Sequence, residues 1–138
     1  MIAHHMGLEC RDLAATEGFY TRHFGFRRAR FVALGDDNAI VFLRSGDFYL
    51  ELFRATSTSP APAAEGAGPE YPGWRHLAFQ VDDVDAALAA MGDDARVTAG
   101  PMGFDAFIPG WKTVWVADPD GNIVEISQGY RDEDAVTL

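Results

Sequence analysis

An internal repeat constrains the fold of this chain more than any other feature of its sequence. The segment HMGLECRDLAAT, which begins at His5, aligns with HLAFQVDDVDAA, which begins at His76. The similarity extends to the far end of each half, because Glu51 and Glu125 follow the two histidines at nearly the same separation. A unit that occurs twice in 138 residues indicates one small architecture built two times in succession.

Each copy of the repeat predicts the same order of elements. An apolar strand is followed by an aspartate, Asp12 or Asp83, that can cap the helix after it. Three further strands follow, and the last two form a hairpin. The expected helices span 13–24 and 84–92, and the strands after them span 26–34, 39–43 and 48–53 in the first copy and 95–100, 113–117 and 123–127 in the second. The pattern predicts an α+β fold in which two βαβββ modules form a curved, cavity-enclosing mixed sheet with the helices on its outer face.

The two modules are separated by a segment of different composition. Residues 55–73 hold four of the seven prolines and almost no large apolar side chain, which is typical of a linker. We therefore expect a single domain over 1–138. Its parts are module one at 1–54, the linker at 55–73, module two at 74–128 and a tail at 129–138. Residues 101–111 are expected to form a loop, which is either a substrate lid or a plain surface connection.

Strand alternation places four polar side chains on one side of the predicted sheet, with their apolar neighbours on the opposite face. These side chains are His5, Glu51, His76 and Glu125. Carboxylates on the concave side of a sheet are costly to desolvate unless they bind a cation. Two imidazoles and two carboxylates form a neutral site with one divalent metal ion, and such ligands suit Zn, Ni, Co, Mn or Fe(II) alike. His4, by the same alternation, is expected to face the helices.

Composition and charge argue against several classes of function. The net charge of −10 repels a phosphate backbone, so we expect no nucleic-acid partner. No apolar run approaches the roughly 18 residues of a membrane span, so no membrane partner is expected. The single cysteine, Cys10, cannot form an internal disulfide and is expected to be a small buried residue, which favours the cytoplasm.

The repeat and its motifs closely resemble the vicinal oxygen chelate superfamily, the group of glyoxalases, bleomycin-resistance proteins and extradiol dioxygenases. The resemblance is carried by HMGLECRDL, YLELF, RHLAFQVDDVDAA and ADPDGNIVEIS. It implies that His5, Glu51, His76 and Glu125 are the metal ligands. It also implies a lyase or isomerase of the glyoxalase type, in which the metal holds two neighbouring oxygens of a small-molecule substrate and Glu51 or Glu125 moves a proton. Related lyases carry an arginine where this chain has Glu9, which disfavours glutathione as the substrate.

Two other functions of this superfamily are alternatives. An extradiol dioxygenase would bind Fe(II) through two histidines and one carboxylate, but no histidine follows His76 to serve as its acid–base group. A non-enzymatic, antibiotic-sequestering protein would use an aromatic pocket, for which the candidates are Tyr49, Phe53, Trp74, Phe107 and Trp111. Because each half-open module must pair with another module, we also expect a homodimer.

Overall fold

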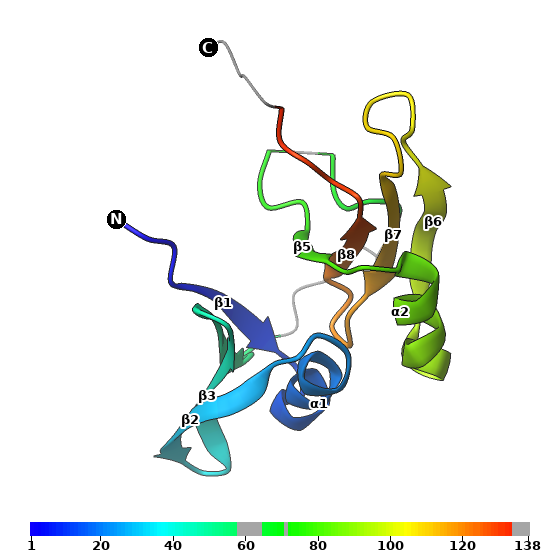
Figure 1. Cartoon of the computed structure of the whole chain (residues 1–138). Helices are drawn as coiled ribbons and strands as arrows, with labels where there is room; N and C mark the ends of the chain where they lie inside the picture. The colour runs from blue at the N-terminus through cyan, green and yellow to red at the C-terminus, as the bar shows by residue number, and fades with distance from the viewer. Residues whose placement is uncertain (58–64, 71, 134–138) are drawn as a thin grey trace. The chain divides into compact units, whose positions relative to one another are not determined.

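The fold is that of a computed structural model, which describes residues 1–57, 65–70 and 72–133 (Figure 1). The chain divides into two compact units. The first is Met1–Pro62 with Asp118–Gly121, and the second is Ala63–Ala117 with Asn122–Leu138. Each unit contains one copy of the repeat.

The first unit is a four-stranded sheet with one helix. Its elements are β1 (His5–Cys10), α1 (Leu13–His23), β2 (Arg27–Gly35), β3 (Asn38–Ser45) and β4 (Phe48–Arg54). The strand order is β1-β4-β3-β2. β1 runs parallel to β4, and the other neighbouring strands are antiparallel.

The second unit repeats this topology. Its elements are β5 (Leu77–Gln80), α2 (Val84–Met91), the short 3-10 helix η1 (Gly92–Asp94), β6 (Val97–Gly103), β7 (Lys112–Ala117) and β8 (Ile123–Gln128). The order β5-β8-β7-β6 reproduces that of the first unit, again with one parallel pair, β5 with β8. The α+β class and the two βαβββ copies are thereby confirmed. Each sheet is open, with unjoined edge strands.

The two predicted helix caps are present. A carboxylate oxygen of Asp12 accepts a hydrogen bond from the backbone N–H of Ala15 at 3.0 Å, and Asp83 accepts one from Ala86 at 2.9 Å. Each bond satisfies one of the N–H groups that the first turn of a helix leaves without an internal partner. Both helices therefore begin one residue after the aspartate, at Leu13 and Val84.

Each sheet buries one face beneath its own helix. In the first unit α1 contributes the buried side chains of Phe19 and Tyr20. The sheet residues in this core are Val41, Leu43, Leu50 and Leu52. In the second unit α2 contributes Val84 and Met91, and the sheet contributes Val114, Val116, Val124 and Ile126. Because side chains alternate along a strand, Glu51 and Glu125 lie on the faces that the helices leave open.

The first unit includes one segment that is distant in sequence. The turn Asp118–Gly121 follows β7, and its carboxylates accept hydrogen bonds from α1 and from Arg11, which lies between β1 and α1. The hydroxyl of Tyr20 donates to Asp118 at 2.9 Å, that of Thr16 donates to Asp120 at 3.0 Å, and Nε of Arg11 lies 3.1 Å from Asp120. Burial raises the pKa of Tyr20, so its hydroxyl keeps the proton that it donates.

The prediction of a loop over 101–111 is partly wrong, because β6 extends to Gly103. The remainder is an ordered turn, in which the backbone N–H groups of Phe107 and Ile108 both donate to the carbonyl of Phe104. The linker expected over 55–73 and the tail expected over 129–138 lie in part outside the described residues. Among the described residues, no helix is long and apolar enough to cross a membrane.

Candidate functional site

The first pair of predicted ligands meets on the open face of the first unit. Parallel pairing of β1 with β4 sets Gly7 opposite Glu51 and His5 opposite Tyr49, so the two functional residues occupy neighbouring rows of one face. Nε2 of His5 lies 3.5 Å from a carboxylate oxygen of Glu51. The Glu51 side chain is 19% exposed, whereas that of His5 is 46% exposed and therefore open to a ligand.

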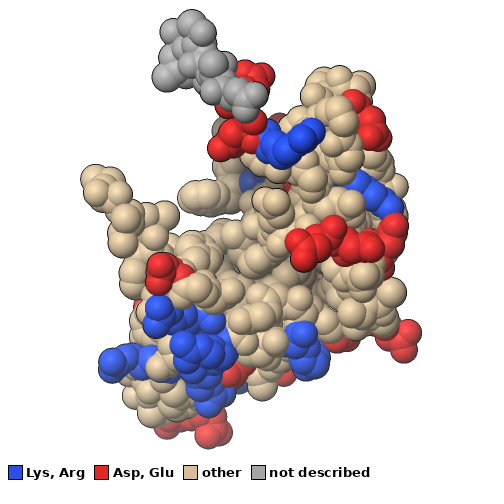
Figure 2. Space-filling view, in the orientation of Figure 1, with Lys and Arg blue, Asp and Glu red and all other residues tan. Residues whose placement is uncertain are grey.

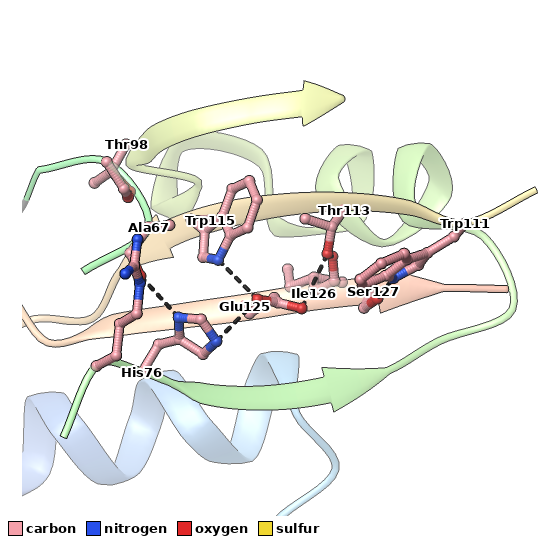
Figure 3. A network of polar contacts seen from close by, with 11 residues as sticks. Ala67, His76, Thr98, Trp111, Thr113, Trp115, Glu125, Ile126 and Ser127 are labelled. Atoms are coloured by element: carbon pink, nitrogen blue, oxygen red, sulfur yellow. Dashed lines mark hydrogen bonds and ion pairs between the residues drawn. The ribbon is translucent and has the colours of Figure 1, made fainter. Parts of the chain in front are cut away.

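The second pair occupies the equivalent place in the second unit (Figure 3). His76 directly precedes β5, and Ala78 pairs with Glu125 across the parallel strands. Nε2 of His76 lies 2.9 Å from a carboxylate oxygen of Glu125. The other ring nitrogen, Nδ1, lies 2.7 Å from the carbonyl oxygen of Ala67. Because a carbonyl only accepts, Nδ1 carries a proton and Nε2 faces the carboxylate.

Both pairs have the spacing of two ligands on one metal ion. Donor atoms at ~2.1 Å from a common ion, at ordinary coordination angles, lie roughly 3.0 to 3.4 Å apart. The His–Glu distances of 3.5 and 2.9 Å are close to that range. The backbone acceptor on Nδ1 of His76 is also the usual outer partner of a metal-bound imidazole. The donor set therefore fits a divalent ion, although no three such side chains gather at one point among the described residues.

The two glutamates differ in what surrounds them. The indole N–H of Trp115 donates to Glu125 at 2.8 Å, and the hydroxyl of Thr113 lies 3.2 Å from its other oxygen (Figure 3). At the equivalent place in the first unit Phe42 lies opposite Glu51 and has no proton to donate. Glu125 is thus held in position, while the described neighbours of Glu51 leave it with the longer contact to His5 alone.

Sequence reasoning missed Trp115 and misplaced His4. Trp115 can be found by counting back along β7 from the Asp118–Gly121 turn, which sets it opposite Glu125. His4 was expected to face the helices, but its ring stacks on Tyr49 at 4.8 Å and contacts His5. The alternation rule fails at His4 because β1 begins only at the next residue.

Three of the aromatic residues proposed for a pocket belong to the second unit and differ in their surroundings. Trp111 packs against Phe104 at 5.0 Å between ring centres and donates to Ser127 at 2.9 Å, so it lies beside the second pair. Trp74 and Phe107 are 85% and 77% exposed. The first unit also has a pocket of about 380 Å³ on the helix side of its sheet. Its lining includes residues at the start of α1 and Val41, and it does not include His5 or Glu51.

Comparisons with known proteins agree with the repeat and the fold. The chain is 32% identical over 130 residues to the uncharacterized protein YaeR of Escherichia coli (strain K12), covering 89% of this chain and 92% of YaeR. The crystal structure of a glyoxalase family protein from Enterococcus faecalis matches with a TM-score of 0.67 at 28% identity, over 91% of this chain and 96% of that one. TnmS3, an antibiotic binding protein from Streptomyces sp. CB03234, shares the fold with a TM-score of 0.65 at 22% identity, over 94% and 97% of the two chains.

The family model extends over almost the whole chain. Residues 2–126 match it, a range that takes in both copies of the repeat and all four predicted ligands. The duplicated βαβββ topology agrees with that match. This chain therefore belongs to the glyoxalase/bleomycin resistance protein/dioxygenase superfamily.

Proposed function

We propose that the chain is a metal-dependent enzyme of the lyase or isomerase type that moves a proton on a small oxygenated substrate. The observation that carries this proposal is the repeated pair, a histidine Nε2 facing a glutamate oxygen at ligand spacing in each unit. The proposed ligands are His5, Glu51, His76 and Glu125. A divalent ion, when bound, would stabilise negative charge that develops on two neighbouring substrate oxygens.

The surroundings of Glu51 and Glu125 favour a different role for each carboxylate. Glu125 accepts the Trp115 N–H, which fixes one oxygen and favours a role as a permanent ligand. Glu51 has no such donor opposite it and is the carboxylate that is free to turn toward the substrate. We therefore assign the base to Glu51, which takes a proton from carbon and returns it to a neighbouring atom.

Metal analysis of the purified protein tests the site. His76→Ala should lose bound metal while circular dichroism shows that the fold is kept. His23→Ala, on helix α1, serves as the matched control and should keep its metal. Equal metal content in wild type and His76→Ala, or no metal in wild type after incubation with Zn²⁺, would contradict the assignment.

Proton exchange tests the reaction. Deuterium uptake from heavy water would be followed across α-hydroxy ketones, hemithioacetals and acyl thioesters. General acid–base groups contribute typically 100- to 10,000-fold, so Glu51→Gln should slow exchange by about that factor at saturating metal. Glu125→Gln should weaken metal binding more than it slows exchange, and the reverse ranking would exchange the two roles.

Two alternatives have distinct outcomes in the same assays. Oxygen consumption with catechols and added Fe(II), in the absence of proton exchange, would favour an extradiol-type dioxygenase. A metal-free protein that binds aromatic antibiotics would favour sequestration. That second alternative is supported by Trp111, Phe104 and Trp115, whose rings lie near one another beside Glu125.

Association into a homodimer stays a prediction. Its support in the first unit is the edge strand β2, on which Phe31 and Leu34 are 52% and 56% exposed. Sedimentation velocity should show a species of twice the 15.1 kDa chain mass, and a monomer alone would contradict the expectation.

A further inference from the structure

Strand β2 carries Arg27, Arg28 and Arg30, and a β-bulge determines which way each arginine points. Arg28 pairs with Leu43, and Arg30 pairs with Phe42, the residue before Leu43 in β3. Ala29 is therefore an extra residue in β2 that has no partner in the ladder. An inserted residue reverses the alternation of side chains beyond it. Arg27 and Arg30 consequently share one face, although residues three positions apart on a regular strand would face opposite ways.

The shared face is the one that carries the first pair of proposed ligands. Arg30 lies opposite Phe42, and Phe42 lies opposite Glu51, so these three side chains form one cross-strand row. The adjacent row contains Arg27, Arg44, Tyr49 and His5. Two strand spacings, roughly 10 Å, separate the backbone of Arg30 from that of Glu51.

The contacts of Arg28 agree with placing Arg27 and Arg30 on the face away from α1. It points to the helix side, where its Nε donates to Glu17 of α1 at 2.7 Å. Arg44 is also engaged, because its Nε donates to the carbonyl of Gly46 at 2.6 Å and its guanidinium lies over the Tyr49 ring. Arg27 and Arg30 are exposed, and neither has a hydrogen-bond or ion-pair partner within residues 1–57, 65–70 and 72–133.

The distribution of charge favours an anion at this place. Residues 1–57 hold seven basic and seven acidic side chains, so the net charge of −10 comes entirely from the rest of the chain. Figure 2 shows basic side chains gathered over the β2 and β3 part of the first unit. An anion that approaches this face of β2 therefore meets the guanidinium groups of Arg27 and Arg30 in a part of the chain whose formal charges sum to zero, in spite of the acidic overall composition.

We propose that Arg27 and Arg30 form an anion subsite that binds a carboxylate or phosphate group at the far end of the substrate. The inference rests on the proposed function, because the near end of that substrate is the pair of oxygens bound beside Glu51. Guanidinium groups bind both oxyanions through paired hydrogen bonds. The substrate class is then a short, oxygen-rich compound with an anionic group a few carbon atoms from its reactive oxygens.

A series of chelating probes tests the subsite on the intact protein loaded with Zn²⁺. Alkyl hydroxamates supply two neighbouring oxygens, and their chains would end in a carboxylate, a phosphonate or an uncharged methyl ester. Calorimetric titration should show that an anionic end lowers the dissociation constant by about tenfold or more relative to the ester. The larger of the carboxylate and phosphonate gains identifies the preferred oxyanion.

Variants assign that gain to the two arginines. In Arg27→Gln/Arg30→Gln the anionic and ester probes should bind equally, whereas Arg28→Gln, on the other face of the same strand, should keep the full difference. A difference that survives the double variant would overturn the subsite. A double variant whose only change is increased self-association would also overturn the subsite. In that case the role of Arg27 and Arg30 would be to protect the edge strand β2 from pairing with another chain. Failure of the ester probes to bind at all would instead refute the proposed metal chelation, and the subsite with it.

Discussion

Replacing Trp115 by phenylalanine removes one hydrogen bond from Glu125 and makes the second unit resemble the first, where Phe42 occupies the equivalent place. The bond is a short one, 2.8 Å from Nε1 to the carboxylate oxygen. Hydrogen bonds to charged groups contribute about 1.5–3 kcal/mol. His76 and Thr113 still contact the carboxylate, so the lower part of that range applies. The expected loss of about 1.5–2 kcal/mol corresponds to a Zn²⁺ dissociation constant raised roughly 10- to 30-fold.

Competition calorimetry with a chelator of known affinity measures that constant. Trp111→Phe is the matched control, because it makes the same chemical change and removes a 2.9 Å bond to the neutral hydroxyl of Ser127 rather than to Glu125. Urea unfolding of the metal-free variants separates lost packing from lost metal affinity. Equal Zn²⁺ affinity in wild type, Trp115→Phe and Trp111→Phe would refute the role given to the indole N–H.

Two substitutions and one labelling experiment test the fold. Tyr20→Phe removes the hydroxyl that donates to buried Asp118, so the free energy of unfolding in urea should fall by about 2 kcal/mol. The control Tyr130→Phe, on an exposed ring, should change that free energy by less than about 0.5 kcal/mol. Asp83→Ala removes the cap of α2 and should cost about 1 kcal/mol, and an unchanged urea midpoint would contradict that role. Burial raises the pKa of Cys10 from 9.0 to about 12, so the folded thiol should resist a disulfide reagent at pH 8. Because the unfolded chain loses this proton first, its contribution to stability should decline as the pH rises from about 9 toward 12, and rapid labelling of the folded protein would contradict the burial.

The starts of the helices and the topology were predictable because their causes are local or repeated. A cap needs only an aspartate before an apolar helical pattern, and Asp12 and Asp83 both supply one. The end of β6 was not predictable in the same way. Pro101 and the glycines beside it are typical of a loop, yet β6 is an edge strand, where the missing N–H of a proline is tolerated.

In the site, the His–Glu pairs follow from strand alternation, but two finer features do not. The bulge at Ala29 has no signal in its own residues, so simple alternation places Arg27 opposite to Arg30 rather than beside it. The difference between the glutamates depends on which residue lies across the hairpin, Phe42 or Trp115, and therefore on the register that each turn sets.

The contribution of Asp118–Gly121 makes the first unit depend on a segment that follows the linker by more than forty residues. A polypeptide that ended in the linker would keep the Thr16 and Tyr20 hydroxyls, each only 1% exposed, without the carboxylates that now accept their protons. Two unmet buried donors cost roughly 2–6 kcal/mol, a large share of the 5–15 kcal/mol by which a domain is ordinarily stable. A chain cut in the linker is therefore expected to have a first unit that is less stable than the same unit in the intact chain.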